Sequence, residues 1–253
     1  MDDSNLAKLK KDWIENSNHR FKKISLPEGK GKFDMLPRWL DNVSYRYNQE
    51  AENNFPQKYY HYSRGTIIRV DFGINMGSEF CGPHFAIVLD KKDNARKRTL
   101  TVVPLTSKPK KGRFPLGKEI FNQTTEILKS QFNNTFQTVK SFSKNVDEDS
   151  IILDKLKANP TPKDNDIEYM EKRVAERKEQ VKDINKELEK LRKAISIYSN
   201  YNKNSFARLT DITTISKFKI KRINKFDPSG KIRLSEQQMQ SISKELMNLF
   251  ITR

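Results

Sequence analysis

Between Gly77 and Leu89 the chain reads GSEFCGPHFAIVL, a glycine-bearing loop that passes directly into an apolar strand. The loop holds a carboxylate at Glu79 and a thiol at Cys81, and His84 stands where the strand begins. An unperturbed imidazole has a pKa near ~6.5, so His84 can accept or donate a proton at neutral pH. The stretch predicts a strand with a candidate catalytic group at its mouth.

Two further segments flank this strand and have strand composition. Residues 66–72 and 99–105 are rich in β-branched and aromatic side chains, and the polar run 91–98 has the character of a hairpin loop. Pro104 requires an edge position or a break in the ladder, because proline has no N–H to donate. Short strands with tight links predict a small antiparallel barrel or curled sheet. Residues 206–220 also have extended character.

Helical periodicity surrounds this strand section. Apolar residues share one face in residues 6–13, 36–47 and 127–139, with a loop predicted at 27–31. From Ile167 to Tyr198, apolar residues recur three and four apart, a heptad seam interrupted at Arg177. Near the C-terminus, Ser235 and Gln238 have capping-box spacing before a helix whose predicted buried residues are Met239, Ile242, Leu246 and Leu249.

These patterns predict an α+β chain in four parts. They are an N-terminal helical extension (1–58), the first part of a barrel (59–121), a helical insertion (122–205) with a coiled-coil-like helix (164–199), and the last part of the barrel with a C-terminal helix (206–253). The heptad helix is expected to pack on helix 36–47, on helix 127–139, on another subunit or on an antitoxin, because its apolar seam needs a partner. We expect it to be a structural and regulatory addition and not part of the catalytic apparatus.

The chain is strongly basic, with 49 Lys and Arg against 32 Asp and Glu and a net charge of +17. This excess favours a polyanionic partner, most often nucleic acid; solubility or attraction to an anionic membrane is the alternative. The single cysteine, Cys81, excludes an intrachain disulfide and offers no zinc site alone. The chain has neither a signal-like N-terminus nor a long apolar run, so we expect a soluble cytoplasmic protein without membrane contact.

Metal-free RNA cleavage needs a base for the 2′-OH, a cation for the charged phosphorane and an acid for the leaving 5′-oxygen. His84 and Glu79 are the candidate proton-transfer groups, and the Thr106 hydroxyl is a candidate phosphate donor. The candidate RNA-binding cations are Arg64, Arg69, Lys108, Lys110, Lys111 and Arg113. The alternatives are a structural histidine, a strand threonine bonded to its own backbone and a solvated basic loop. Tyr59, Tyr60 and Tyr62 either stack on bases or pack under the barrel.

Several short motifs occur in the order found in one known family. They are the strand Arg64–Phe72, Gly77-Ser78-Glu79 with Gly82, Val103–Ser107, Pro115, Ile215–Lys217 and the helix Ser235–Phe250. In these motifs the chain resembles MazF/PemK-type toxins, the mRNA interferases of type II toxin–antitoxin systems. It would be a long variant with helical additions.

The resemblance implies an SH3-like barrel, usually a homodimer, inhibited by a cognate antitoxin. It implies an endoribonuclease that cleaves single-stranded RNA without metal or cofactor and leaves a 2′,3′-cyclic phosphate and a 5′-OH. The family's functional threonine corresponds to Thr106. Its functional arginine falls at His84, where this chain has His-Phe instead of the common Arg-Pro. That departure motivates an alternative, a non-catalytic nucleic-acid-binding module, whereas the retained Glu79, His84 and Thr106 favour the enzyme.

Overall fold

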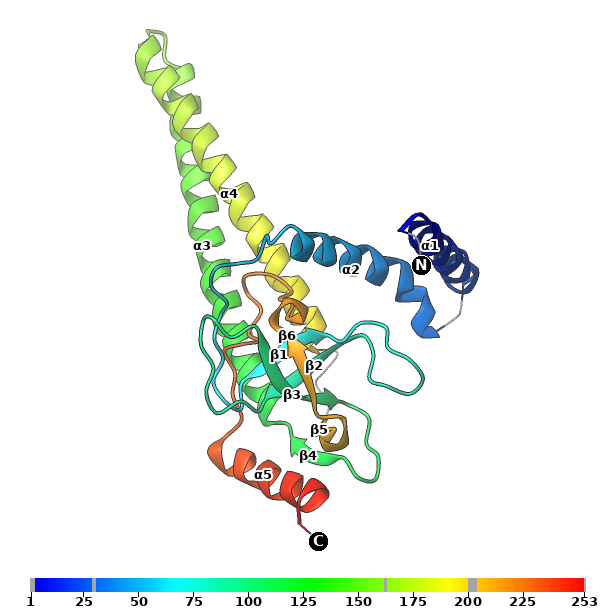
Figure 1. Ribbon diagram of the computed structural model, residues 1–253. Helices are drawn as coiled ribbons and strands as arrows, with labels where there is room; N and C mark the ends of the chain where they lie inside the picture. Colours follow the sequence, from blue (N-terminus) through cyan, green and yellow to red (C-terminus); the bar gives the residue numbers. More distant parts are fainter. Residues whose placement is uncertain (1–2, 29–30, 162, 200–203, 253) are drawn as a thin grey trace.

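The computed structural model describes residues 3–28, 31–161, 163–199 and 204–252, and combines an antiparallel sheet with long helices (Figure 1). This confirms the α+β class. The helices are α1 (Asp3–Ser25), α2 (Leu36–Ala51), α3 (Glu119–Lys157), α4 (Asp164–Ser199) and α5 (Glu236–Phe250), with 3₁₀ turns η1 (Gly31–Met35), η2 (Leu209–Asp211) and η3 (Lys217–Lys219). The strands are β1 (Ile67–Asp71), β2 (Pro83–Val88), β3 (Thr99–Thr106), β4 (Phe114–Gly117), β5 (Ser205–Ala207) and β6 (Thr213–Ser216).

Strand β3 organises the sheet. The strand order is β1-β2-β3-β5-β4, and β6 also pairs with β3. On one side, Val102–Pro104 of β3 pair with β2. On the other side, β6 pairs with Thr99–Val102 and β5 pairs with Leu105 and Thr106. Pro104 lies where these two partners change, so the predicted break in the ladder is confirmed and the edge position is wrong. Pro115 lies in β4, an edge strand that the sequence did not reveal.

The stretch 206–220 is less regular than its β-branched composition suggests. Strands β5 and β6 are separated by η2, and η3 follows β6. The prediction of a continuous extended segment is therefore wrong, because the chain must turn to reach the second half of β3.

The sheet buries apolar side chains on both faces. One cluster contains Ile67, Phe85 and Ile87 and packs against α3, α4 and α5 through residues such as Leu191 and Ile242. The other contains the alternate positions Ile68, Val70, Ala86, Val88, Leu100, Val102 and Ile215. The alternation of successive side chains between the two faces explains why β1 and β2 are apolar over most of their length.

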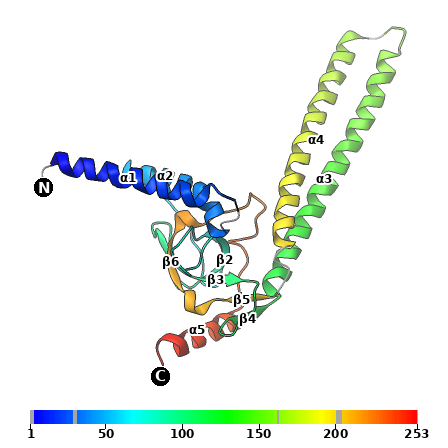
Figure 2. The same ribbon diagram turned by 90° about the vertical axis from the view of Figure 1, so that its right-hand side faces the viewer.

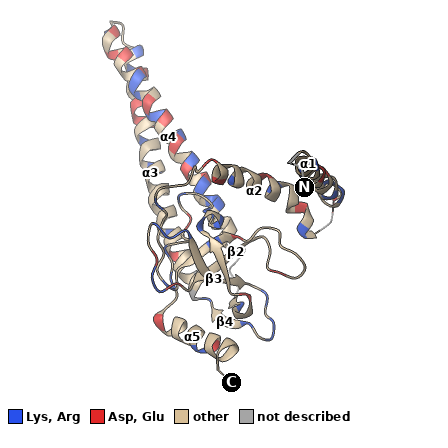
Figure 3. Ribbon diagram, in the orientation of Figure 1, with Lys and Arg blue, Asp and Glu red and all other residues tan. Residues whose placement is uncertain are grey.

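Helices α3 and α4 form a long antiparallel hairpin that projects from the sheet (Figures 1 and 2). The sequence left open which partner the heptad seam of α4 packs on. In the structure α4 packs on α3, which contains the predicted helix 127–139 and begins at Glu119. Arg177, the polar interruption of the seam, pairs with the Asp149 carboxylate at 2.6 Å, and Arg173 donates to the same carboxylate at 2.9 Å. Lys/Arg and Asp/Glu positions alternate along α4, which agrees with its nearly balanced charge (Figure 3).

The terminal helices follow their sequence signals with two differences. Helix α1 is longer than the predicted residues 6–13 and leaves Trp13 60% exposed. The loop predicted at 27–31 ends in η1, and its residues 29–30 lie outside the described residues. Helix α5 begins with the predicted capping box of Ser235 and Gln238. Met239 and Ile242 are buried, but Leu249 is 44% exposed because the end of α5 extends past the sheet.

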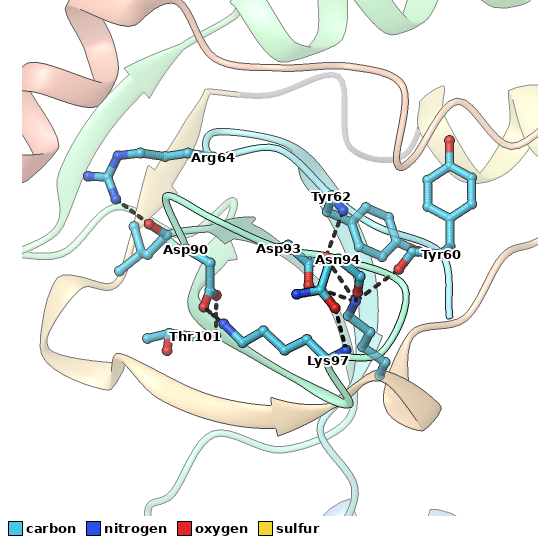
Figure 4. A network of polar contacts seen from close by, with 10 residues as sticks. Tyr60, Tyr62, Arg64, Asp90, Asp93, Asn94, Lys97 and Thr101 are labelled. Carbon is cyan, nitrogen blue, oxygen red and sulfur yellow. Dashed lines mark hydrogen bonds and ion pairs between the residues drawn. The ribbon is translucent and has the colours of Figure 1, made fainter. Parts of the chain in front are cut away.

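The β2–β3 hairpin loop encloses a buried ion pair (Figure 4). The Lys217 ammonium lies 2.8 Å from both Asp93 carboxylate oxygens, and both side chains are almost fully buried. Lys217 also donates to the backbone oxygens of Tyr60 and Asn94, and the Tyr62 N–H donates to Asp93 at 2.8 Å. This network joins the segment before β1, the hairpin loop and the end of β6, at the opposite end of β2 from His84.

None of the helices in the described ranges has an apolar run long enough to cross a lipid bilayer.

Candidate active site

His84 and Thr106 lie near the ends of neighbouring strands and line the same pocket. The register of β2 and β3 pairs Val88 with Val102 and Ala86 with Pro104. Two residues further along in the same register, His84 lies opposite Thr106. Residues two apart on a strand point to the same face, so both side chains leave the sheet on one side.

A small pocket of about 100 Å³ lies at this point of the sheet. His84, Thr106, Ser107 and Lys108 line its rim. Its apolar floor contains Phe85 and Leu105, which alternate with His84 and Thr106 along the strands and belong to the cluster on the other face of the sheet. The structure thus brings together two of the three predicted catalytic residues.

The imidazole of His84 lies in a positively charged, partly dry environment. Its ring is 4.4 Å from that of Phe80, centroid to centroid. Burial is the largest cause that lowers the pKa of His84, followed by the positive charge of Arg208; Arg69 and Lys108 add smaller effects in the same direction, and a hydrogen bond with the Cys81 backbone opposes them. At neutral pH the neutral form therefore predominates, which can accept a proton.

Arg208 is a cation of the site that sequence reasoning missed. It follows β5, and its backbone N–H donates to the Pro104 oxygen at 2.9 Å, which holds it beside the end of β3. The guanidinium lies 4.7 Å from the Phe80 ring centroid and forms an ion pair with Asp211. Phe80 thus lies between the imidazole and a permanent positive charge. A chain position so far from His84 gives no local signal of this contact.

Thr106 and the following loop supply donors at the pocket mouth. The Lys108 backbone N–H donates to the Thr106 hydroxyl oxygen at 3.2 Å, which leaves the hydroxyl hydrogen free to point elsewhere. The Arg113 guanidinium donates to the Lys108 carbonyl and its N–H to the Lys110 carbonyl, so Arg113 closes the loop. Lys108, Lys110 and Lys111 are exposed.

Three predicted site residues lie elsewhere. Glu79 is exposed in the loop before β2 and does not line the pocket. Arg64 donates to the Leu89 carbonyl and, at 2.8 Å, to the Ser243 hydroxyl, which ties α5 to the far end of β2. Arg69 lines a separate cleft, although its charge still acts on His84. The three tyrosines differ in their surroundings. Tyr59 packs edge-on against Phe218, and Tyr62 packs against the apolar cluster that contains Ile68 and Val70. Tyr60 is 67% exposed.

The helical hairpin reaches the pocket. Ile120 of α3 and Tyr198 of α4 both line the floor. The Tyr198 ring lies 5.3 Å from that of Phe85, and its hydroxyl donates to the buried Asp227 carboxylate at 2.6 Å. Burial, with the negative charge of Asp227, raises the pKa of Tyr198 far above its usual value. Tyr198 is therefore a neutral, fixed part of the floor.

Within the described residues, His, Cys, Asp and Glu side chains form no group of three or more that could hold a metal ion. No curated protein matches the chain. Residues 63–145, which include His84, Thr106 and the basic loop, match the family model described as PemK-like, MazF-like toxin of type II toxin–antitoxin system. Over this segment, about a third of the chain, the protein is similar to PemK-like and MazF-like toxins, and long helices lie before and after its strands.

Proposed function

We propose that the protein is a metal-independent endoribonuclease toxin that cleaves single-stranded RNA in the pocket of His84 and Thr106. The observation that carries this proposal is the pairing of these two side chains across β2 and β3 beside Arg208. A neutral base can activate the 2′-OH, and a hydroxyl donor with a cation can stabilise the charged phosphorane, which are two of the three tasks in transesterification of RNA.

In the proposed mechanism, neutral His84 removes the 2′-OH proton of the bound nucleotide. The 2′-oxygen forms a bond to phosphorus while the bond from phosphorus to the 5′-oxygen breaks. The Thr106 hydroxyl and the Arg208 guanidinium stabilise the negative charge of the phosphorane, because both donate hydrogen bonds from fixed positions. The leaving 5′-oxygen takes its proton at the solvent side of the pocket, near the Lys108 ammonium. The products are a 2′,3′-cyclic phosphate and a 5′-OH.

The same proposal extends to architecture and partners. The curled sheet with α5 would be an SH3-like barrel formed by residues 59–121 and 206–253, with 1–58 as an extension and 122–205 as the insertion. The protein would act as a cytoplasmic homodimer held inactive by an antitoxin. The exposed residues Leu249 and Phe250 of α5 are available for such contacts.

The direct test is cleavage of a long single-stranded RNA by the purified protein in EDTA. We expect discrete fragments that end in 2′,3′-cyclic phosphates, identified by mass spectrometry. A set of long RNAs of different sequence is needed, because recognition sites can be rare. Binding to every RNA of the set without any cleavage would favour the non-catalytic RNA-binding module, which the histidine at the family's arginine position motivates.

Replacing Arg208 with Gln should move the acid limb of the pH profile to higher pH. The Arg208 charge lowers the pKa of His84, so its removal raises that pKa and more alkaline conditions are needed to form the neutral base. Single-turnover cleavage rates measured from acid to neutral pH would show the shift. Arg208→Lys keeps a charge and should shift the limb less. An acid limb unchanged in Arg208→Gln would mean that Arg208 does not act on the catalytic base.

Replacing Lys108, Lys110, Lys111 and Arg113 together with Gln should weaken RNA binding and its salt dependence. Each lost phosphate contact lowers the slope of log affinity against log salt by about 0.7 for a single strand. Titrations of a labelled RNA at several salt concentrations measure this slope. Arg113 holds the loop closed, so a variant that replaces only the three lysines keeps the loop structure. Comparing it with the quadruple variant distinguishes an effect of lost charge from an effect of a disrupted loop. An unchanged slope would place the RNA path elsewhere.

A further inference from the structure

A second, larger cleft opens beside His84 and has no role in the proposed chemistry. It has a volume of about 410 Å³ and lies between α2, β1, the end of α4 and the segment after η3. We call it the basic cleft; its charged lining residues are Arg38, Arg69, Asp71, Lys193, Lys221 and Arg222. Gly82 and Pro83 also line it, so it begins one residue before His84.

The charge of the basic cleft is poorly neutralised. Five of the charged lining residues are cationic, and the one carboxylate, Asp71, accepts a hydrogen bond from the Gly73 N–H at 3.1 Å. Arg222 donates to the Asp227 carbonyl at 3.0 Å. In the part of the chain that the structure describes, the side chains of Arg38, Lys193 and Lys221 have neither an ion pair nor a hydrogen bond. Burial is the largest cause that lowers the pKa of Lys221, followed by the positive charge of Arg46. The Asp71 carboxylate raises this pKa, and the Arg38 charge lowers it again.

A smaller hollow of about 180 Å³ continues the basic cleft along α2. The two share Trp39, Asn42, Asp71 and Lys221, and the hollow adds Arg46, Tyr47 and Phe218. Tyr47 is 65% exposed, and the Arg46 guanidinium lies 5.4 Å from the Phe218 ring centroid. Cations beside the exposed ring of Tyr47 suit a single-stranded nucleic acid, whose phosphates pair with cations and whose bases stack on aromatic rings.

The wall formed by α2 is held in place by a close contact. Gly73 has φ +83°, and a Cβ at this position would lie 2.3 Å from the Trp39 indole nitrogen. Only glycine fits both the backbone conformation and the space under the indole ring. The cleft is thus a fixed feature of the fold. Its walls α2 and α4 and its residues Lys221 and Arg222 lie outside the segment that matches the toxin family model.

We propose that the basic cleft binds the sugar–phosphate backbone of single-stranded RNA on one side of the scissile bond. This inference rests on the proposed function and deepens it. The cleft starts next to His84, and the Arg69 charge that lines it also lowers the pKa of His84. The two hollows share no lining residue, but Pro83 of the cleft and His84 of the pocket are adjacent in β2, so an RNA strand bound at His84 has this groove of cations beside it. The long helices would thereby extend the substrate-binding surface beyond the strands shared with the family.

The test neutralises Arg38, Lys193 and Lys221 together, each to Gln, in the full chain. The matched control neutralises Lys140, Lys155 and Lys172, three exposed lysines on the arms of the hairpin. The probe is a fluorescent 20-nucleotide single-stranded RNA with 2′-O-methyl groups, which cannot be cleaved because no 2′-OH is present. We expect the cleft variant to bind at least about tenfold more weakly at low salt and to lose about 2 from the salt slope, since each phosphate contact contributes about 0.7.

Cleavage of two substrates then separates the cleft from the catalytic step. The cleft variant should cleave a long RNA more slowly and a short RNA that fills only the pocket at the wild-type rate. If wild-type protein cleaves no RNA but the cleft variant still binds the probe more weakly than the control, the cleft assignment stands and the proposed function fails.

Two results would overturn the inference. One is equal loss of binding in the cleft and control variants, which would indicate a general effect of net charge. The other is unchanged RNA binding with loss of affinity for a polyglutamate peptide, which would assign the cleft to an acidic protein segment. Circular dichroism and urea unfolding of each variant establish that it is folded. A variant that exchanges the three cations for other cations, Arg38→Lys, Lys193→Arg and Lys221→Arg, should bind the RNA as the wild type does.

Discussion

His84→Ala should reduce RNA cleavage by about 10²–10⁴-fold, the usual loss when a general acid or base is removed. The physical reason is the neutral imidazole opposite Thr106, which no other side chain lining the pocket can replace as a base at neutral pH. Single-turnover cleavage of a short RNA in EDTA measures the loss without a contribution from product release. RNA binding should change little, because neutral His84 contributes no charge to phosphate contacts.

His61→Ala is the matched control, because His61 is exposed and does not line the pocket. It should cleave at the wild-type rate. His84→Arg is the more informative comparison, since it restores the residue that the family commonly has at this position. An inactive His84→Arg protein means that proton transfer is the role of His84, whereas an active one means that charge suffices. Cleavage by His84→Ala at the wild-type rate would remove His84 from the mechanism.

The pairing of His84 with Thr106 was predictable because the two residues lie on consecutive strands joined by a short hairpin. In such a hairpin the end of one strand must return to the start of the other. Glu79 shows the limit of this reasoning. It is only five positions before His84, but the intervening loop turns its side chain to solvent. Closeness in sequence predicts closeness in space on a paired strand and not in a loop.

Arg208 and Tyr198 could not be predicted, because their contacts depend on how distant segments pack. Arg208 reaches the site only because β3 exchanges β6 for β5 at Pro104. Tyr198 belongs to the heptad seam, and its spacing predicted helix packing alone. The seam is real, but its last residue, Tyr198, also packs on Phe85 of the sheet. A periodic pattern thus identified the helix and its apolar face but not where that face ends.

The buried pair of Lys217 and Asp93 was also missed. Asp93 lies in a polar hairpin loop and Lys217 follows a short strand, so both resemble solvated surface charges in the sequence. Charged residues are almost never fully buried unless they are paired, and only the three-dimensional structure supplies the partner. The whole helical insertion lies between the two residues in the sequence, and neither carries a local signal of burial.

Lys217→Met should destabilise the protein by about 3–5 kcal/mol, a large part of the ~5–15 kcal/mol that typical domains possess. The substitution keeps the unbranched apolar part of the side chain but leaves the Asp93 carboxylate buried without its cation. The Tyr62 N–H would remain as a donor to Asp93, but one neutral donor does not compensate the lost ammonium. Urea unfolding monitored by circular dichroism gives the change in the free energy of unfolding.

The double variant Asp93→Asn with Lys217→Met distinguishes two contributions to the loss of stability, namely a buried carboxylate without its cation and the loss of side-chain packing. Asparagine keeps an oxygen for the Tyr62 N–H and carries no charge, so the double variant should be more stable than Lys217→Met alone. Lys186→Met, which breaks the exposed pair with Asp183 on α4, should leave the free energy of unfolding almost unchanged, because solvent screens that pair. The variants of the buried pair, once folded, should still cleave RNA, since the pair lies at the far end of β2 from His84. If Lys217→Met is as stable as the wild type, the Asp93 carboxylate must reach water or take up a proton, and the network does not hold the hairpin as the structure indicates.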